Sequence, residues 1–335
     1  MVIATSAFLL AVLATPAMRR AALGLGVVDH PSMRKHHPQP IPLLGGVAIW
    51  GAVIGSLLLF PERRELVELT GIMIGASWIS FWGLWDDRFG LSPFSKFLVQ
   101  LSAAAILIAV GIQVSLPVPF WTNIILTLFW VVGITNAFNL LDNMDGLSSG
   151  VAAVAAGWFT LLAAINGQYL VGGLAASVFG ACLGFLIYNF NPARIFMGDS
   201  GSLFLGFLMS VLGIKLRFPA NVNWVTWMVP IVVLGVPIFD TSLVVISRLR
   251  RKKNPFTTPG TDHLSHRLHD SGWSRRETVL LICLVGCGLG GVAIFVSLAS
   301  PMAAYAIAGS IGVASTVAIV WLERSRAVGT SGDRT

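Results

Sequence analysis

The chain has 335 residues, of which 55% are hydrophobic and only 11% are charged, and its formal net charge is +7. A soluble domain carries about 25% charged residues, so too few charges are present to cover a water-facing surface of this size. The composition therefore excludes an ordinary soluble protein. It predicts an all-α, polytopic integral membrane protein, because apolar runs of about twenty residues favour membrane helices over a barrel.

About eleven apolar segments are long enough to be predicted as membrane-spanning helices, some of them only with tilt or mismatch. They cover residues 2–18, 43–60, 69–85, 96–114, 121–140, 147–165, 169–188, 202–216, 224–247, 277–298 and 302–322. The ninth segment contains Pro230 and Pro237, which predict a kinked helix. We expect residues 1–323 to form a single transmembrane domain with its functional loops in the cytoplasm, and residues 324–335 to form a disordered cytoplasmic tail.

The basic residues predict the orientation of these segments. If the N-terminus lies outside, all but four of the 22 lysines and arginines fall on the cytoplasmic side, and the exceptions are Arg63, Arg64, Lys215 and Arg217. Cytoplasmic loops of membrane proteins are enriched in basic residues in this way. The C-terminus is then cytoplasmic, and the positive charge needs no nucleic-acid partner.

Most polar side chains that could carry chemistry fall on the same side. They include all six histidines and the aspartates Asp29, Asp86, Asp87, Asp142, Asp145, Asp199, Asp262 and Asp270. This distribution predicts a site at the cytoplasmic membrane surface. Asp240 is different, because it lies within the ninth segment, and an acid inside the membrane is a functional candidate by default.

The first cytoplasmic loop, DHPSMRKHHPQPIPLLGG, begins at Asp29. Its prolines stiffen an extended chain, and Lys35 and His36 give it the charge to contact an anion. By itself, this loop is better interpreted as a basic inner loop that proline makes rigid.

The motif WDDRFGLSPFSK places Asp86 and Asp87 at the end of one helix and Lys96 at the start of the next. Neighbouring carboxylates repel each other, so they favour a bound cation or a raised pKa on one of them. An ordinary solvated turn explains this motif equally well when it is taken alone.

The motif NAFNLLDNMDG repeats a polar residue at every third position, with Asn136, Asn139, Asp142 and Asp145. Residues three apart share a helix face, so these amides and carboxylates are expected to line one cytoplasmic surface. The alternative is a polar helix end with capping residues. Four such groups in register make that alternative the weaker one.

The motif FMGDSGS places Asp199 among small residues at the start of a helix, where a phosphate can approach the backbone closely. Taken alone, this aspartate is better interpreted as a helix cap. In the last loop, His263, His266 and Arg267 lie on a short amphipathic helix that suits a phosphate or nucleotide. A zinc site is disfavoured, because no H-E-x-x-H motif is present.

Together and in this order, over about residues 29 to 278, these motifs resemble those of the polyprenyl-phosphate N-acetylhexosamine-1-phosphate transferases. The resemblance implies a bundle of ten or eleven helices in the bacterial plasma membrane with a cytoplasmic active site. It implies that a UDP-N-acetylhexosamine donates its sugar phosphate to a polyprenyl phosphate lipid and that UMP is released. It also implies Mg²⁺ as the cofactor, with Mn²⁺ as a substitute, and a homodimer.

The same resemblance assigns roles to single residues. The expected catalytic residues are Asp86, Asp87, Asp142, Asp145 and Lys96. The expected substrate-binding residues are Asn139, Lys35, His36, His263, His266 and Arg267. The expected metal ligands are Asp199 and its partner Asn189. Asp86 or Asp87 is expected to deprotonate or position the lipid phosphate, and Asp142 and Asp145 to shape the nucleotide site.

The motifs also favour one branch of the family. The branch that uses UDP-MurNAc-pentapeptide in peptidoglycan synthesis carries a triple histidine in the last loop, whereas this chain has HLSHR there and IPLLGG in the first loop. We therefore expect UDP-GlcNAc as the donor, for an envelope glycan such as O-antigen or teichoic acid. A phospho-MurNAc-pentapeptide transferase stays an alternative. A transporter of an anionic solute is a remote alternative, motivated by Asp240, and an aromatic prenyltransferase lacks its second Asp-rich motif.

Overall fold

The computed structural model describes residues 1–29, 40–59, 65–255, 258 and 260–332. Its helices are α1 Val2–Leu25, α2 Gly45–Leu59, α3 Leu66–Phe89, α4 Pro93–Ala109, α5 Phe120–Leu141, α6 Leu147–Ile165, α7 Tyr169–Asn189, α8 Gly198–Lys215, α9 Asn223–Thr226, α10 Met228–Val233, α11 Gly235–Arg250, α12 Leu264–Asp270, α13 Arg275–Leu298 and α14 Pro301–Gly332. Each predicted apolar segment is helical, and the ninth is divided into α9, α10 and α11. The helical class predicted from the sequence is therefore confirmed.

Fewer helices than predicted meet the length and hydropathy expected of a membrane span. Within the described residues seven helices do so, and the bent ninth segment makes eight if it counts as one span. Helices α2 and α4 have 15 and 17 residues, which is short for a bilayer that needs about 20. The protein is polytopic, while the count of eleven crossings and the positions of the termini stay predictions.

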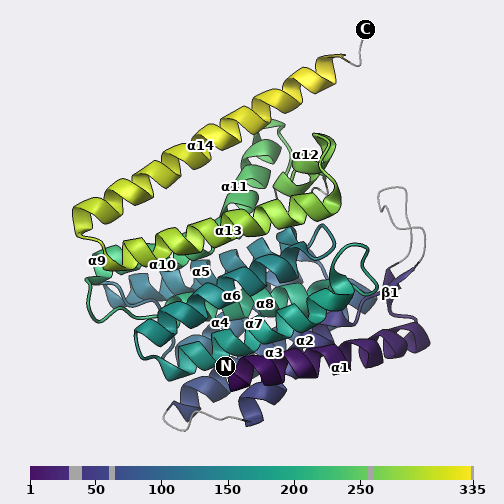
Figure 1. The fold of residues 1–335 in the computed structure, drawn as a ribbon, viewed down its shortest axis with the longest axis horizontal. Coiled ribbons are helices and arrows are strands. Elements are labelled where there is room, and N and C mark those ends of the chain that lie inside the picture. The colour runs from purple at the N-terminus through teal and green to yellow at the C-terminus, as the bar shows by residue number, and fades with distance from the viewer. Residues whose placement is uncertain (30–39, 60–64, 256–257, 259, 333–335) are drawn as a thin grey trace.

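The predicted kink in the ninth segment is present. The axis bends by 74° between Asn223–Val233 and Gly235–Arg250. Pro230 and Pro237 lie in the first turns of α10 and α11, where a missing N–H is tolerated at a helix start but prevents one unbroken helical ladder from running through the segment. Beyond the bend, α11 turns toward α12 and α14 (Figure 1).

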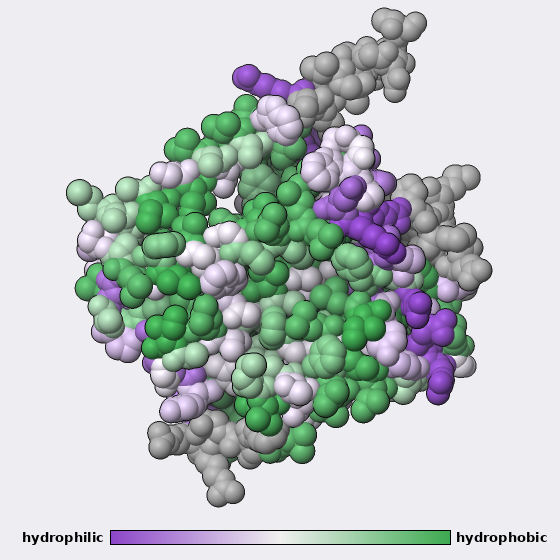
Figure 2. Space-filling view, in the orientation of Figure 1, coloured by the Kyte–Doolittle hydropathy of each residue, from purple (hydrophilic) through white to green (hydrophobic). Residues whose placement is uncertain are grey.

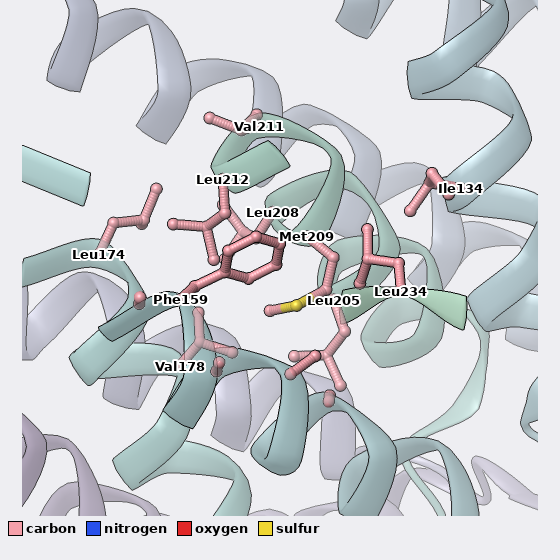
Figure 3. Packing of buried hydrophobic residues seen from close by; sticks show 14 of the residues in the cluster. Ile134, Phe159, Leu174, Val178, Leu205, Leu208, Met209, Val211, Leu212 and Leu234 are labelled. Atoms are coloured by element: carbon pink, nitrogen blue, oxygen red, sulfur yellow. The ribbon is translucent and has the colours of Figure 1, made fainter. Parts of the chain in front are cut away.

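Helix α8 lies at the centre of the bundle and packs against α2, α3 and α5. In Figure 3, Leu208 and Leu212 of α8 lie close to Phe159 of α6 and Leu174 of α7. Phe159, Leu208 and Leu212 are almost completely buried. Nearly every residue of α8 is buried, so the surrounding helices enclose it. The first turn of α8, which carries Asp199, is consequently held firmly in place.

Helix α12 and the two strands lie at one end of the bundle, which we call the polar end (Figure 1). The strands β1 Val28–Asp29 and β2 Ile41–Pro42 are short and antiparallel, and they join the two ends of the first loop. They are a small departure from the predicted all-α class. Figure 2 shows that the largest hydrophilic patches gather at this end. Lys35 and His36 of the same loop lie outside the described residues.

Helix α14 projects away from the rest of the bundle (Figure 1), and only 6% of its apolar window is buried. It stays helical to Gly332. The boundary predicted between residues 323 and 324 therefore falls inside a helix. The division into one domain and a tail stays a prediction.

Candidate active site

A cleft of about 1270 Å³ opens at the polar end of the bundle. Its lining includes the aspartates of three separate motifs and an asparagine of the second motif, namely Asp86, Asp87, Asn139, Asp142, Asp145 and Asp199. These residues come from the ends of α3 and α5, the loop after α5 and the first turn of α8. The structure therefore brings together the carboxylates that the sequence analysis grouped into one site.

The Asp199 carboxylate is bound on both of its oxygens. Lys96 Nζ donates to Oδ2 at 2.7 Å, and Asn139 Nδ2 donates to Oδ1 at 2.8 Å. Lys96 also forms an ion pair with Asp86, and Asn139 also donates to Ser202 Oγ at 2.9 Å. Lys96 thus connects two carboxylates, and its side chain keeps 28% of its surface exposed. A lysine in this position can exchange a carboxylate partner for a phosphate.

Asp87 caps helix α8. Its carboxylate accepts hydrogen bonds from the backbone N–H groups of Asp199, at 2.8 Å, and of Ser200, at 3.2 Å. Free N–H groups at a helix N-terminus need such an acceptor. The helix cap that the sequence suggested for Asp199 is therefore supplied by Asp87, and Asp199 lines the cleft.

The turn into α8 depends on glycine. Gly198 has a φ of +68°, and a Cβ at this position would overlap the Asp87 carboxylate. A Cβ at Gly83 of α3 would lie 2.6 Å from the carbonyl oxygen of Asp199. Glycine is needed where a backbone is left-handed or where another backbone approaches this closely. These two glycines allow Asp87 and Asp199 to sit side by side.

Asp145 and Asn189 shape the segment between α7 and α8. Asp145 Oδ2 accepts from Asn191 Nδ2 at 2.9 Å and from the N–H of Ala193 at 3.0 Å. Asn189 is buried, accepts from Ser149 Oγ at 2.9 Å, and donates to the carbonyl oxygen of Ile195 at 3.0 Å. Asn189 lines the cleft, but its contacts hold the loop, and no described contact links it to Asp199.

Asp142 accepts no hydrogen bond from the described residues, although it lines the cleft. Burial, followed by the charges of Asp199, Asp87 and Asp145, raises the pKa of Asp142 from its ordinary value of 3.8 to about 8. Such a concentration of negative charge favours either a proton or a cation.

The donor set fits Mg²⁺ of the kind that substrate phosphates help to hold. No group of three or more His, Cys, Asp or Glu side chains within the described residues is arranged as a complete metal site. Magnesium usually takes only one or two protein carboxylates and completes its shell with water and phosphate. Asp142 and Asp199 offer such carboxylates in this cleft.

Only one of the three residues predicted on α12 as substrate contacts lines the cleft. His266 does so, and burial, then the nearby His263, lower its pKa. His263 is 5% exposed and turns away to Asp240, with 2.7 Å between Nδ1 and Oδ2. Arg267 pairs with Glu323 of α14 at 2.5 Å and donates to the carbonyl oxygen of Leu322 at 2.8 Å. Successive residues on a helix point about 100° apart, so His266 and Arg267 reach different neighbours.

The structure also adds residues that the sequence analysis did not select. Arg19, Arg194, His269 and Arg275 line the cleft, and together they give it a basic rim. In the sequence these residues stand out only as basic residues or loop histidines of the predicted cytoplasmic side. Their one signal was position, because Arg194 lies five residues before Asp199 and Arg275 opens α13.

Comparison with known proteins places the chain in a family. The sequence model of glycosyl transferase family 4 matches residues 69–217. A probable undecaprenyl-phosphate N-acetylglucosaminyl 1-phosphate transferase of Bacillus subtilis is 40% identical, over 81% of this chain and 78% of the relative. A decaprenyl-phosphate N-acetylglucosaminephosphotransferase of Mycobacterium tuberculosis is 32% identical, over 93% and 86%. A phospho-N-acetylmuramoyl-pentapeptide-transferase of Bacillus cytotoxicus is 30% identical, over 88% and 97%.

The relatives cover most of the chain, and the matched residues 69–217 contain the three aspartate motifs of the cleft. They confirm the family that the order of the motifs predicted. The chain belongs to glycosyl transferase family 4, among the polyprenyl-phosphate N-acetylhexosamine-1-phosphate transferases.

Proposed function

We propose that this protein transfers N-acetylglucosamine-1-phosphate from UDP-GlcNAc to undecaprenyl phosphate and releases UMP, as the first membrane step of an envelope glycan pathway. Two of the three relatives reported above are named as transferases of N-acetylglucosamine phosphate, and the relative with 40% identity is one of these two. The relative named for MurNAc-pentapeptide transfer is less similar, at 30% identity. Similarity thus favours the donor that the HLSHR and IPLLGG sequences predicted.

The observation that carries the proposal is the Asp86–Lys96–Asp199–Asn139 network in one cleft. Both substrates are anions, and two phosphate groups repel each other strongly near a low-dielectric membrane boundary. A site that brings them together must supply positive charge between them. Lys96 supplies one such charge beside the cleft, where it contacts the lining residues Asp86 and Asp199, and the basic rim supplies more.

The cofactor that fits this cleft is Mg²⁺, with Mn²⁺ as a substitute, and Asp142 and Asp199 are the residues that would hold it. When bound, the metal would supply screening of the phosphates and stabilisation of the charge on departing UMP. Lys96 keeps the Asp199 carboxylate ionised and oriented. Asp87 is bound to the backbone of α8, and Asp86 accepts from the N–H of Leu91 and pairs with Lys96, so both stay candidates to orient or deprotonate the lipid phosphate.

The contacts of Asp240 make a transporter of anionic solutes a weaker alternative. Asp240 is 2% exposed, and its carboxylate accepts from the N–H of Leu264 at 2.7 Å in addition to its contact with His263. An acid bound in this way holds helices together and does not face a transport path. A cytoplasmic active site in the bacterial plasma membrane and a homodimer belong to the proposal as expectations of the family resemblance.

The test uses purified full-length protein in detergent with undecaprenyl phosphate and Mg²⁺. UDP-GlcNAc, UDP-GalNAc and UDP-MurNAc-pentapeptide are offered separately, and released nucleotide is identified by chromatography. We expect UMP with UDP-GlcNAc only, and we expect EDTA to abolish it. UMP only with the pentapeptide donor would move the chain to the other branch. Release of UDP would mean transfer of the sugar without its phosphate, and the proposed reaction would be wrong.

A further inference from the structure

A second polar network lies along one face of α11, a helix that Figure 1 shows beside α12 and α14. Asp240, Ser247 and Arg251 recur on this face at helical spacing. Asp240 and Arg251 contact the residues that lead into α12, and Ser247 Oγ accepts from Arg251 and from Arg267 of α12. Asp240 lies near the start of α11, shortly after the 74° bend. Neither Asp240 nor Ser247 lines the cleft. The catalytic roles proposed above leave this network unused.

Asp240 binds the first residues of α12 through both of its carboxylate oxygens. Oδ1 accepts from the N–H of Leu264, and Oδ2 meets Nδ1 of His263, each at 2.7 Å. Asp240 and His263 are 2% and 5% exposed. A charge-assisted contact of this kind is strong, because water does not compete for the groups. It fixes where α12 begins and which way its first turn faces.

The segment is also joined to the cleft on its other side. Ser265 Oγ donates to Asn143 Oδ1, and Asn143 lies between the cleft residues Asp142 and Asp145 in sequence. The ring of His263 stands 6.1 Å from the ring of His266, at an interplanar angle of 65°. His266 lines the cleft. A chain of contacts therefore runs from Asp240 through His263 to the side chain that faces the substrate site.

We infer that Asp240 is a positioning residue that holds α12 so that His266 faces the UDP-sugar in the cleft; this inference rests on the proposed function. Asp240 does not touch the substrate in this arrangement. It acts through His263 and the N–H of Leu264, in the way that an outer carboxylate orients a histidine in a metal site. The intramembrane acid of the ninth segment thereby acquires a role in donor recognition.

The test is a double-mutant cycle with Asp240→Asn, His266→Ala and the double variant, in full-length protein. We expect Asp240→Asn to lower kcat/KM for UDP-GlcNAc by about 10- to 100-fold, as loss of an outer-shell partner does, with an unchanged KM for undecaprenyl phosphate. In the His266→Ala background, Asp240→Asn should lower kcat/KM almost no further, because the effects of coupled residues are not additive. Ser242→Ala is the control, since this hydroxyl only bonds the carbonyl oxygen of Ile238 within α11.

Amide hydrogen exchange of residues 261–270 gives a readout that does not depend on activity. Exchange in this segment should accelerate in Asp240→Asn and stay at the wild-type rate in Ser242→Ala. Independent effects of Asp240→Asn and His266→Ala on kcat/KM, or unchanged exchange, would overturn the inference. If wild-type protein transfers no sugar phosphate, the proposed function fails, and exchange alone decides whether Asp240 holds α12. Should Asp240→Asn not be recovered folded, Asp240→Glu, which keeps the charge and moves it, enters the same cycle.

Discussion

Two networks of charged side chains lie at the polar end of the bundle, and they use their charges in opposite ways. Around Asp199, which lines the cleft, the side chains of Lys96 and Asp199 keep 28% and 26% of their surface exposed. Between α11, α12 and α14, the paired side chains of Arg267 and Glu323 keep only 7% and 9%. A charge that faces a cleft can exchange its partner for a ligand, whereas a charge buried against its partner mainly fixes the position of helices.

The largest effect is expected in the first network. Asp199→Asn removes the charge that Lys96 and Asn139 hold in place. We expect UMP release to fall by about 10²- to 10³-fold or more, as it does when one preorganised charged or polar group is lost from an active site. The measurement is initial UMP release at saturating Mg²⁺ and at several Mg²⁺ concentrations.

The matched control for this prediction is Glu68→Gln. Glu68 is also paired with a lysine, Lys215, but it lies near the start of α3, at the opposite end from Asp86. Normal activity in this variant shows that loss of a carboxylate as such does no harm. Near-normal activity in Asp199→Asn would contradict the assignment of the cleft as the active site.

The next effect tests the turn at Gly198, which lets Asp87 cap α8 while Asp199 lines the cleft. Gly198→Ala forces a left-handed alanine, at a cost of about 1–2 kcal/mol, and places a methyl group against the Asp87 carboxylate. We expect activity to fall by about tenfold to a hundredfold, because displacement of a reacting group by about 1 Å can cost that much. Gly133→Ala is the control, since a Cβ at Gly133 on α5 meets open space. Full activity in Gly198→Ala would show that the capping of α8 by Asp87 does not matter for catalysis.

Changes to the buried pair of Arg267 and Glu323 should affect stability more than catalysis. Arg267→Met leaves Glu323 without its closest partner in a largely buried place, and removal of one partner of a buried pair costs about 3–5 kcal/mol. Arg267→Met with Glu323→Leu should recover much of this loss, because no uncompensated charge remains. Melting temperatures of the three proteins give the comparison.

The same substitution distinguishes the two networks directly. If Arg267→Met leaves the melting temperature unchanged but raises KM for UDP-GlcNAc, then Arg267 contacts the substrate phosphate, as the motif resemblance predicted. The buried contacts with Leu322 and Glu323 would then not describe the working protein.

The contrast also shows what a sequence can predict here. The helices could be predicted because long apolar runs are a local property of the chain. The grouping of Asp86, Asp142 and Asp199 could be predicted because the order of the motifs resembles that of a known family. The partners of each carboxylate could not be predicted in this way. Whether Asp87 or Asp199 caps α8 depends on the close packing of Gly83 and Gly198, which brings segments far apart in sequence together.

The predictions for α12 meet a similar physical limit. His263 and Arg267 belong to a motif that suggested substrate contacts, yet the structure gives each of them a protein partner on another helix. Asp240 of α11 contacts His263, and Glu323 of α14 forms an ion pair with Arg267. Nothing in the local pattern of a seven-residue helix indicates which side faces the cleft. Only the docking of α11 and α14 decides that, and both come from other parts of the chain.

The smallest effect concerns Asp142 and reports whether a cation belongs in the first network. With a pKa raised from 3.8 to about 8, folded Asp142 keeps a proton that the unfolded chain has already released. The unfolded state therefore binds fewer protons between about pH 4 and pH 8, and stability from this group falls as pH rises through that window. Asp142→Asn cannot titrate, so the melting temperature of wild type relative to this variant should decline from pH 5 to pH 8 in EDTA.

Magnesium should reverse this trend, because a cation that binds ionised Asp142 replaces the proton and stabilises the folded state more at high pH than at low pH. Wild type in Mg²⁺ should then gain melting temperature over Asp142→Asn as pH rises toward 8. The buried network offers the contrast, since Glu323→Gln should respond to Mg²⁺ as wild type does. An equal pH slope for wild type and Asp142→Asn, with or without Mg²⁺, would place the cation elsewhere in the cleft and leave Asp142 as a group that only shapes it.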